Sequence, residues 1–368
     1  MKILRPVSML AGLLMISASA MAQTPLLPPP GAPKPLLPPP GMPTPVAKKE
    51  KPKPKPPVAA KKTAPAATPK PVATPAPTAT VTPAPVFEDP NVDLVYGAYQ
   101  RGQYKTAFDL ATNRAQFNGD PKAMTMLGEL YSNAMGVKRD YAKAAEWYKR
   151  AADGGDREGM FALAMLRLAG RGGPINREEA VKLLASAAKL GNPKAAYNLA
   201  LLYLDGQTLP QDLKRASELL RISADAGNPE AQYALATFYK EGTGVPKDIE
   251  KAIRLLQAAS LADHVDAEVE YAIALFNGTG TPKNEAAAVA LLHKAARQNS
   301  PIAQNRLARV LVSGQGAPMD KIEGLKWHIV AKTAGKGDPL LDEALASLSP
   351  EDRAKAQDAA RKWTGTPK

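Results

Sequence analysis

Apolar and polar residues follow one another along most of the chain in a pattern that returns every 36 residues. In each unit a small residue is followed, four residues later, by a large apolar residue that is nearly always leucine. The small residues are Ala123, Gly159, Ala195, Ala231, Ala267 and Ala303. Residues four apart lie on one face of an α-helix. Each unit therefore predicts an amphipathic helix that begins near this position, such as one over residues 193–204.

A second helix is predicted in the latter half of every unit. It begins at an aspartate or asparagine, and small and large apolar residues follow at helical spacing. These first residues are Asp140, Asn176, Asp212, Asp248, Asn284 and Asp320. Such side chains accept hydrogen bonds from the free N–H groups at the start of a helix. One helix pair cannot bury both of its apolar faces alone, so the units are expected to stack as an all-α solenoid.

The connections between units are as regular as the helices. Glycines such as Gly191 and Gly227 end the second helix of a unit, and an Asn-Pro pair then begins the next helix. The connection at Asp263–Val265 departs from this pattern, and we expect a weaker joint there.

The stretch "EGTGVPKD", from Glu241 to Asp248, is similar to a phosphate-binding loop in its glycines and lysine. A Walker-type loop follows a strand and leaves its backbone N–H groups free for phosphate. Here a helix precedes, Pro246 removes one N–H group, and Asp248 puts a carboxylate where the phosphate would lie. The same loop recurs in the sister units as "NGTGTPKN" and "SGQGAPMD". We therefore interpret it as a connection between two helices and predict no nucleotide site.

The first unit resembles the Sel-1-like repeat family, whose members are related to tetratricopeptide repeats. The matching positions are Ala123, Leu127, Gly128, Tyr131, Gly136, Val137, Asp140, Lys143, Ala144, Trp147, Tyr148, Ala151, Ala152 and Gly155. The resemblance implies a right-handed α/α superhelical solenoid of Sel-1-like and tetratricopeptide-like helix pairs. We place six repeats in residues 123–338, a degenerate capping pair in residues 87–122, and capping helices with a tail in residues 339–368.

The N-terminus has the features of a secretory signal peptide. Lys2 and Arg5 precede an apolar run, and Ala20 and Ala22 form a small-x-small cleavage site. We expect residues 1–22 to be removed, leaving no membrane span; the alternative is an uncleaved anchor, but the run is about half of the roughly 20 residues that a spanning helix needs. The chain has no cysteine, hence neither disulfides nor lipid attachment after the cleavage site. Export without disulfides predicts a periplasmic protein, or a secreted one.

Residues 23–86 form a segment rich in proline, lysine and alanine. They hold most of the 36 prolines and no aromatic residue, so we expect disorder after the signal peptide and before the helices. Of the net charge of +13, +2 lies in residues 1–22 and +8 in this segment, which leaves +3 for the helical part. A folded nucleic-acid binder carries its basic charge on the folded part, so no nucleic-acid partner is predicted. The segment is either an arm that contacts peptidoglycan or an anionic surface, or a passive tether.

No enzyme chemistry, cofactor or metal site is predicted. Ser186 and Lys189 match the serine-x-x-lysine of penicillin-binding enzymes, but they lie within a repeat helix and lack the partner motifs. His264, His293 and His328 stand in different units. Family members described as binding or hydrolysing β-lactams are cysteine-rich, so the resemblance carries no such activity to this chain.

The candidate binding surface lies on the first helix of each unit, which the resemblance places on the concave side of the solenoid. The positions two and six residues after the small residue are apolar or aromatic in the middle units, which suggests a protein-binding groove. The predicted partner-binding residues are Phe161, Met165, Tyr197, Leu201, Tyr233 and Thr237. The alternative is that these side chains only pack against the next unit.

Together these features predict a non-enzymatic periplasmic scaffold, adaptor or regulator that binds protein partners in cell-envelope processes. The alternative is a peptidoglycan-binding or cell-wall-active protein, either a hydrolase or a regulator of one.

Overall fold

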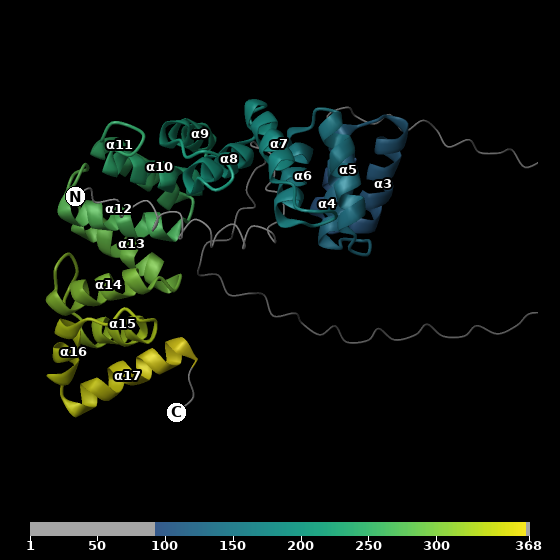
Figure 1. Ribbon diagram of the computed structural model, residues 1–368. Coiled ribbons are helices and arrows are strands. Elements are labelled where there is room, and N and C mark those ends of the chain that lie inside the picture. The colour runs from purple at the N-terminus through teal and green to yellow at the C-terminus, as the bar shows by residue number, and fades with distance from the viewer. Residues whose placement is uncertain (1–92, 366–368) are drawn as a thin grey trace, which may run out of the picture. The chain divides into compact units, whose positions relative to one another are not determined.

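The computed structural model describes residues 93–365. The predicted signal peptide and proline-rich segment lie outside these residues. The described part contains 16 α-helices and no strand (Figure 1). In chain order the helices are α2 (Leu94–Gln100), α3 (Tyr104–Phe117), α4 (Pro121–Asn133), α5 (Tyr141–Asp153), α6 (Arg157–Ala169), α7 (Arg177–Lys189), α8 (Pro193–Asp205), α9 (Leu213–Asp225), α10 (Pro229–Glu241), α11 (Ile249–Leu261), α12 (Val265–Asn277), α13 (Glu285–Arg297), α14 (Pro301–Ser313), α15 (Lys321–Thr333), α16 (Pro339–Ala346) and α17 (Pro350–Thr364).

The helices from α4 to α15 form six antiparallel pairs. We call the first helix of each pair helix A (α4, α6, α8, α10, α12 and α14) and the second helix B. Each helix A packs chiefly on helix B of its own unit, and each helix B packs on helix A of the next unit. The contacts are therefore between neighbours in the chain, as in a solenoid. The predicted all-α solenoid is confirmed.

Side-chain caps fix where the helices begin. All six B helices begin directly after the predicted aspartate or asparagine, and in each the side chain accepts a backbone hydrogen bond. Asn284 Oδ1, for example, accepts from the N–H of Ala287 at 3.0 Å. The sequence prediction of these caps is confirmed.

The loop from Glu241 to Asp248 connects two helices. Gly242 ends α10 with a φ of 77°. Gly244 has a φ of 67°, and a Cβ placed there would lie 2.4 Å from the carbonyl oxygen of Leu213, so only glycine fits. Asp248 Oδ1 accepts from the N–H of Lys251 at 2.9 Å, and this bond lowers the pKa of Asp248. The carboxylate therefore already occupies the helix start, which confirms the interpretation of this loop as a connection.

The joint before α12 has neither the glycine nor the Asn-Pro pair found at Gly191 and Gly227, but it keeps a left-handed residue followed by a helix cap. Asp263 takes the left-handed conformation, with a φ of 63°, and His264 caps α12 through Nδ1, which accepts from Ala267 N at 3.2 Å. Lys294 Nζ lies 2.5 Å from Asp263 Oδ1 and 2.6 Å from Oε1 of the buried Glu268. These ion pairs link α13 to the joint. The weaker joint expected from the sequence stays a prediction.

Small residues allow close helix packing inside each unit. A Cβ added to Gly128 of α4 would lie 2.5 Å from the ring of Tyr148 on α5. At the C-terminal end, α17 covers α15, where the rings of Trp327 and Trp363 meet edge to face at 5.0 Å. No helix within residues 93–365 is both long and apolar enough to cross a membrane.

Candidate partner-binding site

The six predicted site residues lie on the A helices α6, α8 and α10, and they divide into two groups. Tyr197 and Thr237 are buried, with exposed fractions of 2% and 6%. Phe161, Leu201 and Tyr233 are half-buried and pack against the apolar cores of adjoining units. Met165 is also half-buried. The buried pair therefore packs as the alternative interpretation expects, and the other four retain some exposed surface.

The same two positions are polar in the terminal units, where other parts of the protein bind them. In the first unit, Thr125 Oγ1 donates to Asp156 at 2.6 Å, and Glu129 accepts from Tyr148 and Asn133. In the last unit, Asn305 and Arg309 both bind Asp338 at the start of α16. The polar side chains at the two ends of these columns thus bind other residues of the protein. Between them the columns are apolar or aromatic except at Thr237, whose hydroxyl donates to the backbone oxygen of Tyr233.

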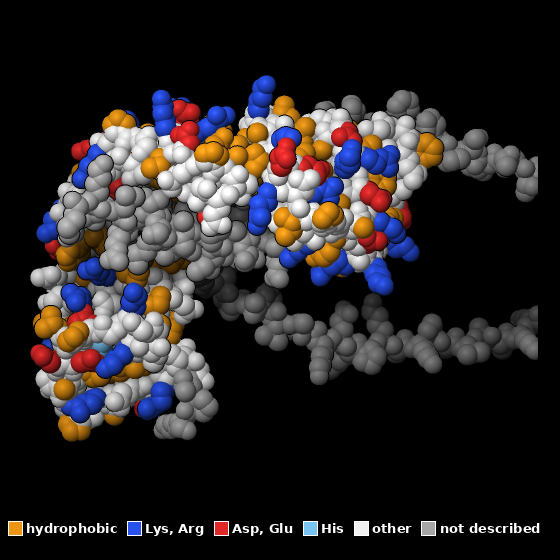
Figure 2. Space-filling model, in the orientation of Figure 1, with side chains coloured by type: hydrophobic (Ala, Val, Ile, Leu, Met, Phe, Trp, Pro, Cys, Tyr) orange, Lys and Arg blue, Asp and Glu red, His pale blue; other side chains and the backbone are white. Residues whose placement is uncertain are grey.

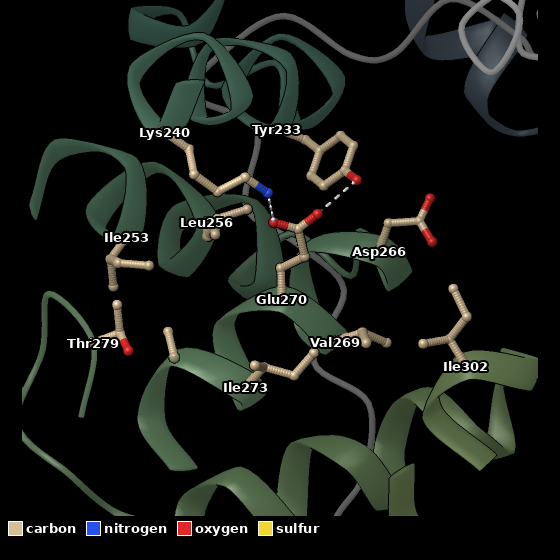
Figure 3. Close-up of a pocket in the computed structure, with 11 residues that line it drawn as sticks. Tyr233, Lys240, Ile253, Leu256, Asp266, Val269, Glu270, Ile273, Thr279 and Ile302 are labelled. Atoms are coloured by element: carbon tan, nitrogen blue, oxygen red, sulfur yellow. Dashed lines mark hydrogen bonds and ion pairs between the residues drawn. The ribbon is translucent and has the colours of Figure 1, made fainter. Parts of the chain in front are cut away.

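A cavity of about 400 Å³ opens between α10, α11 and α12, with one wall from α14. Figure 3 shows most of its lining. The lining residues are Tyr233, Lys240, Ile253, Leu256, Asp266, Val269, Glu270, Ile273, Ala274, Thr279 and Ile302. Tyr233 is the one predicted site residue among them. Val269 and Ile273 occupy the same two positions in the next unit, so the structure places the opening one unit further along the chain than the sequence suggested.

A smaller side chain contributes to the cavity. Ala274 occupies the seventh position after the small residue in its unit. The corresponding residues of the other units are Leu130, Leu166, Leu202, Phe238 and Val310. Protein interiors are close-packed, so an alanine where the sister units have a larger side chain leaves unfilled space. The exchange is visible in the sequence, but whether it leaves an opening depends on how the neighbouring helices pack around it.

One carboxylate joins the polar groups at the cavity. Glu270 on α12 accepts a hydrogen bond from the Tyr233 hydroxyl at 3.1 Å and pairs with Lys240 Nζ at 2.7 Å (Figure 3). Burial, and then the charge of Glu270, raises the pKa of Tyr233, so its hydroxyl stays a donor. Lys240 itself replaces an apolar residue, since the corresponding position holds leucine, phenylalanine or valine in four of the other units. The ion pair and the hydrogen bond fix two neighbouring A helices to each other.

The aromatic wall of the cavity is held from a second side. The ring of Tyr233 stacks on the ring of His264, with centroids 4.7 Å apart and an angle of 23° between the planes. His264 is itself fixed as the cap of α12. Tyr233 therefore presents a rigid surface, and little side-chain entropy is lost when a ligand packs against it.

The charges at the cavity do not balance. Lys240 and Glu270 neutralise each other, whereas Asp266 is exposed at the rim and adds one negative charge. An apolar cavity with a negative rim can take an aliphatic group that stands beside a cation.

The residues singled out from the sequence for possible chemistry lie apart in the described part of the chain. Ser186 lies exposed within α7, and His328 contacts Asp342 at 2.8 Å. Within residues 93–365, no three histidine, aspartate or glutamate side chains come close enough together to hold a metal ion. On the face drawn in Figure 2, basic and acidic side chains are interspersed.

Comparison with known proteins agrees with this architecture. The family model described as "Sel1 repeat" matches residues 121–156, 157–192, 193–228, 229–264, 265–300 and 301–336. No match was found among curated proteins.

Two solved structures show the same fold. A Sel1 repeat protein from Oxalobacter formigenes has 25% identity and a TM-score of 0.58, over 65% of this chain and 98% of that chain. A protective antigen of uropathogenic Escherichia coli strains that displays an SLR fold has 24% identity and a TM-score of 0.51, over 73% of this chain and 67% of that chain. Because the repeat model covers more than half of the chain in six uninterrupted units, the protein belongs to the Sel1 repeat family.

Proposed function

We propose that this protein is a non-enzymatic adaptor or regulator in the periplasm, and that it binds a protein partner of the cell envelope on its A helices. Sel1 repeat proteins are generally scaffolds for protein–protein interactions, and their fold is typically non-catalytic. Periplasmic location is proposed from the leader-like residues 1–22 and from the absence of cysteine.

The observation that carries the proposal is the cavity beside Tyr233. It combines an apolar floor, a fixed aromatic wall and a few polar groups at the rim, which is the usual composition of a binding site. It also lies on the A helices, where the repeat pattern predicted the partner surface.

In-cell photo-crosslinking tests this proposal. A photoreactive residue placed at Asp266, on the rim of the cavity, should yield a protein adduct. The matched control at Glu250, exposed on the helix B α11, should not. Equal adducts at the two positions, or none at either, would count against partner binding on the A helices.

The periplasmic location has a separate test. Osmotic shock should release the chain into the periplasmic fraction in a form shortened at the N-terminus. Recovery of the full-length chain with a cytoplasmic marker would show the location to be wrong.

A second candidate function is direct binding to the cell wall. The net charge of +8 in residues 23–86 favours it, because spaced lysines are attracted to anionic surfaces. Purified sacculi should then pellet the protein, and deletion of residues 23–86 should abolish pelleting. Pelleting that survives the deletion would place wall affinity in the repeats instead.

A further inference from the structure

We infer that the occupant of the cavity between α10, α11 and α12 is a partner segment in which an aliphatic side chain lies beside a lysine or arginine. This inference rests on the proposed function and specifies the chemistry of the partner. Three features of the cavity support it: the apolar lining, the apolar surface that extends from it, and the charge at its rim.

The inner part of the cavity is apolar and can accept an aliphatic group. Ile253, Leu256 and Val269 form buried apolar surface around it, and Ala274 leaves part of the space open. A larger side chain fills that part in the sister units, so the cavity can accept at least one aliphatic side chain of a partner.

Ile302 continues this apolar surface out of the cavity. It lies in the first turn of α14 with 44% of its surface exposed. The corresponding residues of the other units are all charged: Lys122, Glu158, Lys194, Glu230 and Asp266. An exposed isoleucine at a position otherwise reserved for charge, next to an apolar cavity, is typical of a contact surface.

The charge at the rim favours a cation over an anion. Glu270 is already paired with Lys240, and both of its oxygens have a partner. The charged lining residues therefore leave a net charge of −1, carried by the exposed Asp266. An incoming lysine or arginine would find a partner there, and an incoming carboxylate would be repelled.

The structure also supplies matched variants for a test. Ala274→Leu fills part of the cavity with the residue found in three sister units, so it should leave the fold intact. Val310→Leu makes a similar change at the same position of the next unit, outside the cavity. Asp266→Asn removes the rim charge, and Ile302→Lys restores the charge that sister units carry.

The experiment is selection of peptides from a displayed random library against the full chain without residues 1–22, followed by affinity measurements on the enriched peptides. We expect enriched sequences to share an aliphatic residue within four positions of a lysine or arginine. Ala274→Leu and Ile302→Lys should each weaken binding at least tenfold without lowering Tm, whereas Val310→Leu should not weaken it. Asp266→Asn should weaken the basic peptides severalfold and leave their Lys→Gln or Arg→Gln versions unchanged.

Several results would overturn the inference. These are enriched peptides that lack a basic or an aliphatic residue, or full binding to both Ala274→Leu and Ile302→Lys. If peptides tiled from residues 23–86 bind more tightly than any selected sequence, the occupant is the chain's own segment. If light scattering shows a dimer that Ala274→Leu dissociates, the occupant is a second copy. Rim crosslinks in cells together with any of these results would leave the proposed adaptor function standing and refute only this partner chemistry.

Discussion

Glu129 on α4 is a carboxylate whose surroundings oppose its charge. It is buried, and burial raises its pKa even though Tyr148 and Asn133 donate hydrogen bonds to it. The effect extends to Tyr99, whose pKa is raised to about 12, chiefly by burial and next by the negative charge of Glu129. The ionised form of Glu129 is therefore less favourable in the folded protein than in the unfolded chain.

This environment makes the stability depend on pH. Because the folded pKa lies above the unfolded one, the folded state retains the proton longer, and stability falls as the pH rises through the interval between the two values. A Glu129→Gln variant keeps an acceptor for Tyr148 but cannot ionise. Its free energy of unfolding should exceed that of the wild type at pH 7, and the difference should shrink as the pH falls towards 4.5.

Urea unfolding between pH 4 and pH 8 measures this difference. Glu178→Gln provides a contrast of opposite sign. Lys182 lowers the pKa of the exposed Glu178, so its ionised form adds stability that is lost as the pH falls, and any difference from wild type should be a loss of stability at pH 7. A difference between Glu129→Gln and wild type that is independent of pH would contradict the assignment.

The partner-binding residues expected from the sequence stay a prediction. Of the six, Tyr233 lines the cavity. Tyr197 was chosen by the same rule and is buried, because the pattern gives the direction of a side chain and not how closely the next unit approaches it. Ala274 was not predicted because it contributes to the cavity by being smaller than the corresponding residues of the other units, and not by a contact of its own.

At the scale of the helix, the units resemble one another most in how their helices begin and end. Five A helices end at a glycine in the left-handed conformation, whereas α4 ends at Ala134, with a φ of 58°. A residue with a Cβ is strained there, and glycine is not. Exchanging alanine and glycine at this position therefore tests, in both directions, whether glycine is favoured at the end of helix A.

Ala134→Gly should stabilise the protein by about 1 kcal/mol, because Ala134 is exposed and has only strain to lose. Gly242→Ala, at the same position of the fourth unit, should destabilise it by about 1 kcal/mol. A Cβ at Gly242 would meet Lys247 Cβ at 3.4 Å, an ordinary contact, so the loss is conformational and not steric. Thermal unfolding of both variants gives the comparison, and effects of the same sign would refute the explanation.

At the scale of the whole molecule, each repeat unit is stabilised mainly by the units next to it. Each unit contacts mainly the units on either side, so the end units depend on the helices that cover them. At the C-terminal end this cover is α17, which buries Ala356 and Ala360 and places Trp363 against Trp327.

Removal of residues 350–368 should therefore loosen the C-terminal end first. Hydrogen exchange followed by mass spectrometry should show loss of amide protection in α14 and α15, while α6 to α9 stay protected. Deletion of residues 366–368 alone should change nothing in these helices. A uniform loss of protection along the chain would mean that the units unfold as one cooperative body.

The sequence by itself determined the solenoid from α4 to α15, because the local repeat places the caps and apolar faces of both helices within one unit. Asp248 caps α11, Gly242 ends α10, and stacking follows from apolar faces that no single pair can bury. The tertiary structure alone decided where an opening remains between units. The opening depends on the packing of three helices around Ala274, and on the pairing of Lys240 with Glu270 across two units. A periodic pattern specifies what the units have in common, whereas the candidate site arises where one unit departs from it.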